Sequence, residues 1–128
     1  MKEQVRTDAA PAPFRGAPYS QAIKANGFVF VSGQLALQPG DKGLLPGGIV
    51  EQTEQAFANL RAILEAAGSS LEQIVKTTVF LQNLDDFAAM NEVYARHVGN
   101  TPPARSTFQV AKLPSGALVE IEVIAAEG

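Results

Sequence analysis

The most informative stretch of this chain is residues 102–123, which reads Pro-Pro-Ala-Arg-Ser-Thr-Phe-Gln-Val-Ala-Lys-Leu-Pro-Ser-Gly-Ala-Leu-Val-Glu-Ile-Glu-Val. The two prolines exclude helix immediately before Arg105 and favour extended backbone. A strand then begins at Arg105, a Pro-Ser-Gly turn follows, and a longer strand begins near Val119. If these strands pair as a hairpin, Arg105 and Glu120 lie within reach of each other on one sheet.

Strand alternation predicts which of these side chains share a face. Arg105, Thr107 and Gln109 point to one side of the first strand, whereas Glu120 and Glu122 lie opposite the Val and Ile side chains of the second. Spacing alone favours a structural cross-strand salt bridge between Arg105 and Glu120. Only the remaining motifs of the chain favour a catalytic pair instead.

The composition limits the classes of function. A chain of 128 residues with 46% hydrophobic and 18% charged residues indicates one globular domain with its own core. The net charge of −3, without a run of Lys or Arg, disfavours nucleic acid as the main partner. With no cysteine and one histidine, we expect neither a thiol nucleophile nor a metal site. No secretory signal or membrane-spanning run is visible, so we expect a cytoplasmic protein.

The amino-terminal half predicts an arm followed by a hairpin. Residues 1–13 are polar with Pro and Ala, and we expect them to form a flexible arm before a single domain over residues 14–128. Asn26-Gly27 predicts a tight turn, because both positions tolerate positive φ, between strands near residues 20–25 and 28–32. Phe and Val at every position of residues 28–31 predict that this strand is covered on both faces.

Helices and strands alternate in the rest of the chain. Apolar residues at three- and four-residue steps predict a helix over residues 49–67, and Val- and Thr-rich residues 74–82 predict a strand. Asn83 is expected to cap a second helix over residues 84–98. With right-handed crossovers, this order predicts an α+β fold with both helices on one face of a mixed sheet. Because several strands are apolar on both faces, we expect another copy of the chain to cover the second face.

Several ordered blocks of sequence resemble the RidA family, also called the YjgF or L-PSP family. Arg105 within Pro-Ala-Arg-Ser, the run Val-Ala-Lys-Leu-Pro at 110–114 and Val-Glu-Ile-Glu at 119–122 match its signature. Further blocks agree at residues 18–22, 31–34, 65–68 and 75–81, so the resemblance covers about residues 11–125. Several blocks in the same order are far more specific than one motif. Position 107, cysteine in well-known members, is Thr107 here.

The resemblance implies a chorismate-mutase-like fold, assembled as a homotrimer with active sites in the clefts between subunits. It also implies hydrolysis of reactive 2-imino acids, such as 2-iminobutanoate and 2-iminopropanoate, to 2-keto acids and ammonia, without a cofactor. On the family's pattern Arg105 binds the substrate carboxylate, and Glu120 handles the water or the proton. The same pattern places five residues around the substrate: Tyr19, Ser32, Gly33, Asn91 and Thr107.

The residue types suit this chemistry. The planar fork of an Arg side chain matches a carboxylate bidentately. A Glu with little solvent and an acidic neighbour has a raised pKa and can act as acid and base near neutral pH, and Glu122 would be such a neighbour of Glu120. Imines already hydrolyse in water, so positioning can supply much of the acceleration.

Simpler interpretations stay open for the individual residues. Tyr19 is equally a packed aromatic, and Asn91 a polar residue on a buried helix edge. Ser32 has no His or Asp spaced to activate it, which argues against a nucleophilic serine. His97 is expected to be a charge at a helix end or a subunit contact. At the level of the protein, the alternatives are a non-catalytic sensor of small keto or amino acids and an endoribonuclease.

Overall fold

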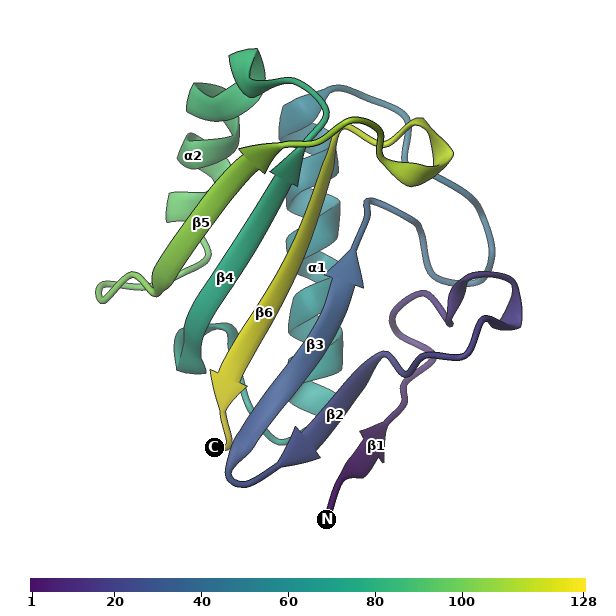
Figure 1. The fold of residues 1–128 in the computed structure, drawn as a ribbon, viewed down its shortest axis with the longest axis vertical. Helices are drawn as coiled ribbons and strands as arrows, with labels where there is room; N and C mark the ends of the chain where they lie inside the picture. Colours follow the sequence, from purple (N-terminus) through teal and green to yellow (C-terminus); the bar gives the residue numbers. More distant parts are fainter.

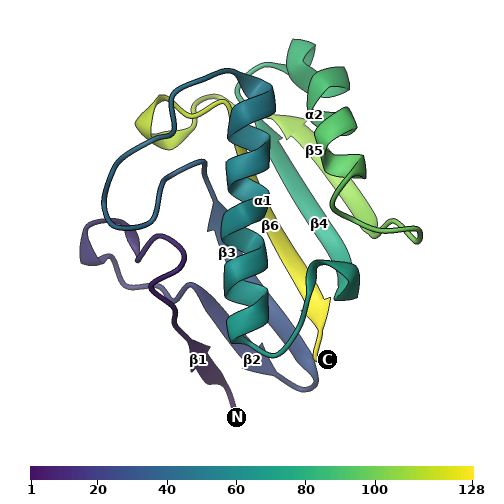
Figure 2. The same ribbon diagram turned by 180° about the vertical axis from the view of Figure 1, so that it is seen from behind.

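The computed structural model describes residues 1–128 and contains a six-stranded mixed sheet with two helices on one face, as Figures 1 and 2 show from opposite sides. The sheet order is β1-β2-β3-β6-β4-β5. Strands β4 and β5 run parallel, and every other neighbouring pair is antiparallel. The predicted α+β fold is therefore confirmed. The elements are β1 (Glu3–Val5), β2 (Ala22–Ala25), β3 (Phe28–Gln34), α1 (Ile49–Ala66), β4 (Ile74–Leu81), α2 (Phe87–Ala95), β5 (Ala104–Gln109) and β6 (Val119–Ala126).

The predicted hairpin between the strands of Arg105 and Glu120 is wrong, because β4 lies between β5 and β6 (Figure 1). Helix α2 returns the chain so that β5 pairs parallel with β4. The connection from β5 to β6 then crosses the end of β4. It is held there by hydrogen bonds from Val110 N to Leu81 O and from Gln82 N to Leu118 O, each 3.0 Å long. The Pro-Ser-Gly turn forms within this crossing, at Pro114–Gly116, and not at the tip of a hairpin.

The predicted turn at Asn26-Gly27 is confirmed. Both residues have positive φ, 52° and 82°, and β2 pairs with β3 from Ala25–Phe28 onward. The arm expected over residues 1–13 is packed in this structure, because β1 pairs with β2 and both Val5 and Ala10 are buried. The boundary of the domain at residue 14 stays a prediction.

Helix α1 packs its apolar stripe against the sheet. Phe57, Leu60 and Leu64 are fully buried, as the three- and four-residue steps predicted, whereas Val50 at the first turn is 40% exposed. Glu51 Oε1 accepts a hydrogen bond from Gly48 N, which satisfies one free amide of the first turn. The helix therefore supplies much of the single core that positions the sheet.

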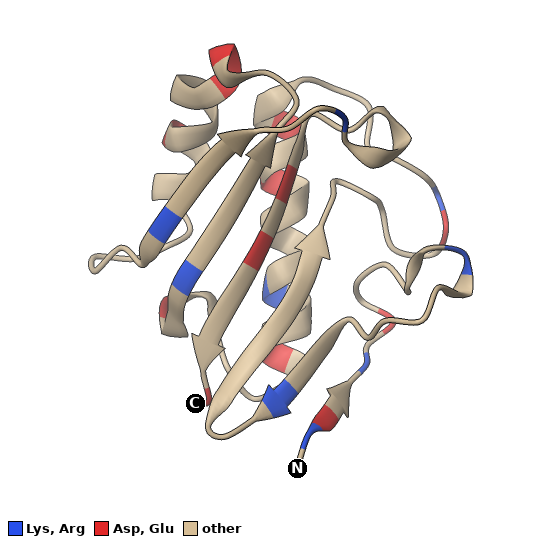
Figure 3. Cartoon of the chain, in the orientation of Figure 1, with Lys and Arg blue, Asp and Glu red and all other residues tan.

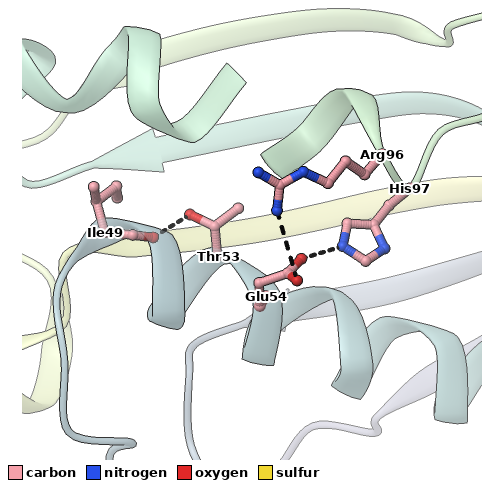
Figure 4. Close-up of polar contacts among 5 residues, drawn as sticks. All are labelled: Ile49, Thr53, Glu54, Arg96 and His97. Carbon is pink, nitrogen blue, oxygen red and sulfur yellow. Dashed lines mark hydrogen bonds and ion pairs between the residues drawn. The ribbon is translucent and has the colours of Figure 1, made fainter. Parts of the chain in front are cut away.

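Helix α2 is shorter than predicted and is joined to α1 by His97. Asn83 Oδ1 caps a 3-10 turn at Leu84–Asp86, and Phe87 starts the α-helix. His97 stacks on Phe57 with ring centroids 4.6 Å apart, and its Nε2 hydrogen-bonds to Glu54, which Arg96 also approaches at 4.0 Å (Figure 4). His97 thus joins two helices of the same chain.

The face of the sheet opposite the helices carries exposed aromatic rings. Phe28, Phe30 and Phe108 are 41%, 43% and 53% exposed, although they lie on strands and not in loops. The alternation that buries Val79 and Ile121 under the helices sends the intervening side chains of β4 and β6 to this open face. Exposed rings in this number are typical of an interface with another molecule.

Candidate active site

A cavity of about 500 Å³ lies beside Glu120 on the open face of the sheet. Fourteen residues line it: Pro11, Ala12, Phe14, Ala17, Tyr19, Gln21, Ser32, Gly33, Gln34, Leu35, Leu37, Pro114, Glu120 and Glu122. They come from the chain before β2, the end of β3, the loop after it, the crossing near Pro114 and the first half of β6. Four predicted site residues are therefore together here, namely Tyr19, Ser32, Gly33 and Glu120.

A β-bulge at Ser32-Gly33 makes room for the Glu120 side chain. Val31 pairs with Val123 and Gln34 pairs with Ile121, so β3 contains one residue more than β6 over this interval. A Cβ at position 33 would collide with the Glu120 carboxylate and would lie 2.9 Å from its Cδ. Glycine at this position thus lets the carboxylate lie against the backbone of β3.

Glu120 has a raised pKa. Burial within the cavity is the main cause, because it disfavours the charged form, and the negative charge of Glu122 raises the pKa of Glu120 further. Glu122 lies two residues along β6 on the same face and lines the same cavity. A carboxyl group that keeps its proton to higher pH is suited to general acid and base chemistry.

Tyr19 and Ser32 form hydrogen bonds that order the cavity wall. The Ser32 hydroxyl donates to Ser20 O at 2.6 Å, which fixes the segment before β2 beside the bulge. Tyr19 OH accepts from Phe14 N at 2.7 Å, and Tyr19 is 45% exposed. Because the Ser32 hydroxyl hydrogen is used by the backbone, the structure gives no support to a nucleophilic serine.

Arg105 lies in a different place, on the helix side of β5. Its guanidinium carbon is 4.7 Å from the ring centroid of Tyr94 and 5.4 Å from that of Phe87, both on α2. Tyr94 is itself fixed by a 2.7 Å hydrogen bond between its hydroxyl and that of Thr77, the register partner of Arg105 on β4. The two rings hold the guanidinium by cation–π contacts, each contributing about 0.5–2 kcal/mol.

The guanidinium of Arg105 has no carboxylate partner. The three ion pairs of the chain are Lys24–Glu127, Arg96–Glu54 and His97–Glu54. The structural salt bridge between Arg105 and Glu120 that spacing alone favoured is therefore absent. An oriented, half-buried Arg without a counter-ion is suited to bind an anionic group from outside the chain.

Asn91 and Thr107 accompany Arg105. Asn91 lies one turn from both Phe87 and Tyr94 on α2, and Thr107 follows Arg105 by two residues on the same face of β5. Asn91 Oδ1 and Thr107 Oγ1 are buried without a hydrogen-bond partner. Buried polar atoms of this kind are normally paired, so their gathering beside a free guanidinium marks this cluster as a polar half-site.

The two clusters lie on opposite faces of the sheet. Glu120 is on the open face, whereas Arg105 shares the helix side with Thr77, its fully buried partner. Figure 3 shows the basic position of β5 separated by β4 from the two acidic positions of β6. The expectation that Arg105 and Glu120 meet within one chain is therefore wrong, because alternation turns them to different faces.

The rings of Phe87 and Tyr94 contact the candidate residue Arg105, and the sequence did not predict this contact. Their periodicity assigned them only to the apolar stripe of α2. The signal was their spacing, since Asn91 lies four residues after Phe87 and three before Tyr94.

No group of three or more His, Cys, Asp or Glu side chains is placed to hold a metal ion. Neither helix is long and apolar enough to cross a membrane.

Fold and site together define a small α+β protein that carries an arginine half-site and a carboxyl half-site on separate surfaces. Residues 7–127 match the family described as Endoribonuclease L-PSP. A RutC family protein of Pyrococcus horikoshii is 49% identical over 98% of both chains. The 2-iminobutanoate/2-iminopropanoate deaminase of Mus musculus is 44% identical over all of this chain and 93% of the mouse protein. The chain therefore belongs to the Endoribonuclease L-PSP family, the RidA family that its motifs resemble.

Solved structures agree with this assignment. The crystal structure of yeast Mmf1 superposes with a TM-score of 0.94 at 46% identity, covering 100% of both chains. That of E. coli TdcF with bound serine gives 0.90 at 38% identity, covering 98% of this chain and 99% of TdcF. The six-stranded sheet with two helices on one face is thus the fold of the family.

Proposed function

We propose that this protein hydrolyses reactive 2-imino acids, such as 2-iminobutanoate and 2-iminopropanoate, to 2-keto acids and ammonia. The single observation that carries the proposal is the guanidinium of Arg105, which is oriented by two rings and has no carboxylate partner. Relatives at about 44–45% identity that are named 2-iminobutanoate/2-iminopropanoate deaminase support the choice of substrate.

Arg105 binds the substrate carboxylate through its planar fork, and Asn91 and Thr107 line the same half-site. Glu120 supplies the acid–base chemistry. Its protonated carboxyl donates to the imine nitrogen while water adds to the C=N carbon. The carboxylate then takes one proton of the added water, which gives a carbinolamine. It passes that proton to the amine nitrogen, and takes the proton of the hydroxyl group as the C–N bond breaks and ammonia leaves. The balance is one imino acid and one water consumed, and one keto acid and one ammonia released.

The active site is completed by a second copy of the chain, in a cytoplasmic homotrimer. Two observations support this. The half-sites lie on opposite faces of one sheet, so no single copy can present both to a small substrate. The open face also carries exposed Phe28, Phe30 and Phe108, which an adjoining copy would cover. In the assembly, Tyr19, Ser32 and Gly33 form the wall on the Glu120 side.

The test is ammonia release from imines generated in the assay by threonine dehydratase. The purified protein is expected to accelerate it, and Arg105→Ala is expected to abolish the acceleration while the mass of the oligomer stays unchanged. Absence of acceleration by the wild type would contradict the proposal.

A binding-only function is the second candidate, favoured by the TdcF structure, which contains bound serine. In that case calorimetry would detect binding of 2-ketobutyrate to a protein that leaves the imines untouched. The family description also names an endoribonuclease activity. Cleavage of RNA that survives Arg105→Ala would show that any such activity arises elsewhere than at this site.

A further inference from the structure

One buried amide holds the amino-terminal segment in place. Gln21 is only 3% exposed, and its side chain makes four hydrogen bonds to backbone groups that precede it by 10 to 14 residues. Its Oε1 accepts from Thr7 N at 2.8 Å. Its Nε2 lies 3.0 Å from Thr7 O, 3.3 Å from Ala10 O and 2.8 Å from Pro11 O. The side-chain amide of Gln21 therefore provides these backbone groups with the hydrogen bonds that a neighbouring strand would otherwise provide.

The held segment is a wall of the Glu120 cavity. Pro11, Ala12 and Phe14 all line that cavity, and all three are apolar residues. Phe14 is held by a separate hydrogen bond, because its backbone N–H donates to the hydroxyl of Tyr19 at 2.7 Å. Figure 1 shows this purple segment beside the end of β3, where the bulge lies. We call residues 7–14 the strap.

We propose that the strap determines which substrate side chains the protein accepts, and that Gln21 is the positioning residue that sets it. This inference rests on the proposed function. The polar parts of a 2-imino acid are its carboxylate and its C=N group, which Arg105 and Glu120 engage. Its remaining part is the side chain, and the apolar wall next to Glu120 is formed by the strap together with Leu35 and Leu37.

A wall of this composition selects for small apolar side chains. Phe14 is the largest side chain of the strap, so it limits the room for the substrate most strongly. Each methylene that fits or fails to fit an apolar pocket changes discrimination by about 10- to 200-fold. Shortening Phe14 therefore admits branched or aromatic imino acids, whereas releasing the strap at Gln21 loosens the wall as a whole.

The experiment compares two variants with the wild type on imines of different size. Phe14→Ala enlarges the cavity, and Gln21→Leu removes all four hydrogen bonds at nearly constant volume. Imines with ethyl, isobutyl and benzyl side chains are generated by an amino acid oxidase, and kcat/KM is measured for each. Val50→Ala is the matched control for Phe14→Ala, because Val50 is similarly exposed, 40% against 44%, and lies on α1 outside the cavity.

We expect Phe14→Ala to raise the ratio of kcat/KM for the benzyl substrate to that for the ethyl substrate at least about tenfold. We expect Gln21→Leu to raise KM for the ethyl substrate more than it lowers kcat, and to speed hydrogen exchange of the amides of residues 7–14. The control should leave the ratio unchanged. A purely structural role of Gln21 would instead lower kcat/KM for every substrate by one factor.

The failures of the two proposals are distinguishable. A wild type that turns over no imine contradicts the proposed function, and calorimetry with 2-keto acids of the same three sizes then tests the strap by affinity. A wild type that turns over imines, with a benzyl-to-ethyl ratio that neither variant changes, contradicts the strap alone.

Discussion

At the scale of residues, the proposed chemistry depends on two side chains with opposite requirements. Arg105 needs to stay charged and free, and the rings of Phe87 and Tyr94 orient it without neutralising it. Glu120 needs to keep a proton, and burial together with the charge of Glu122 raises its pKa. Because they lie on separate faces of the sheet, the two side chains of one copy do not form a direct ion pair with each other.

Replacing Glu120 by Gln is expected to lower kcat by about 10²- to 10⁴-fold, because the acid and base of the reaction are lost. The fold should tolerate the change. Since burial raises the pKa of Glu120, ionisation of its carboxyl opposes folding. The unfolding free energy of the wild type should therefore decrease, relative to that of Glu120→Gln, as pH rises from about 4 through the folded-state pKa. Denaturant unfolding of both proteins across this range checks the sign, and a difference independent of pH would contradict it.

Glu122→Gln is expected to move the pH dependence of the reaction. Removing the neighbouring negative charge lowers the pKa of Glu120, so the loss of activity at high pH should begin at a lower pH than in the wild type. Profiles of kcat/KM against pH measure this shift. An unshifted or oppositely shifted profile would show that Glu120 is not the acid.

Arg105→Lys separates charge from geometry. Lysine keeps the positive charge but loses the bidentate fork and the stacking on both rings. We expect KM to rise about 10- to 150-fold, the equivalent of about 1.5–3 kcal/mol for hydrogen bonds to a charged group. Initial rates over a range of imine concentrations provide the measurement. If the variant kept the KM of the wild type, binding would not depend on the fork.

At the scale of elements, the bulge in β3 makes the room that the Glu120 carboxylate occupies. A regular β3 would place a side chain where the Glu120 carboxylate lies, and Gly33 removes the Cβ that would collide with it. Helix α2 and strand β5 position Arg105 in a similar way. The parallel register places Arg105 opposite Thr77, and the aromatic rings of α2 lie against its guanidinium.

Gly33→Ala is therefore expected to displace the Glu120 carboxylate and to lower kcat by about 10²-fold, the usual cost of moving a catalytic group by about 1 Å. Position 33 does not have positive φ, so the backbone accepts alanine and the oligomer should persist. Gly48→Ala is the matched control, because its Cβ would meet only Glu51 Oε1 at an ordinary 3.6 Å. Equal activities of the two variants would contradict the role of the bulge.

At the scale of the whole molecule, the proposed sharing of the site between two copies makes a prediction that a site within one copy does not make. Arg105→Ala and Glu120→Gln should each be inactive alone. When the two are unfolded together and refolded as mixed oligomers, roughly a quarter of the sites should regain both intact groups, because each site takes one half from each of two randomly chosen copies. Ammonia release by the mixture measures this recovery. A mixture as inactive as its components, despite verified exchange of subunits, would contradict the shared site.

The sequence by itself determined most helices and strands of the fold, although not β1, and the site residues that it indicates stay a prediction. Local physics explains this success: Asn26-Gly27 accepts positive φ, α1 follows its apolar period, and alternation sorts β6 into a buried and a polar face. The tertiary structure alone decided how these elements meet. Pairing between strands depends on residues far apart in the chain. Helix α2 connects β4 to β5 so that the two strands pair in parallel, and β4 therefore lies between β5 and β6. That pairing placed Arg105 and Glu120 on opposite faces, and the bulge at Gly33, the rings around Arg105 and the bonds of Gln21 likewise depend on residues far apart in the chain.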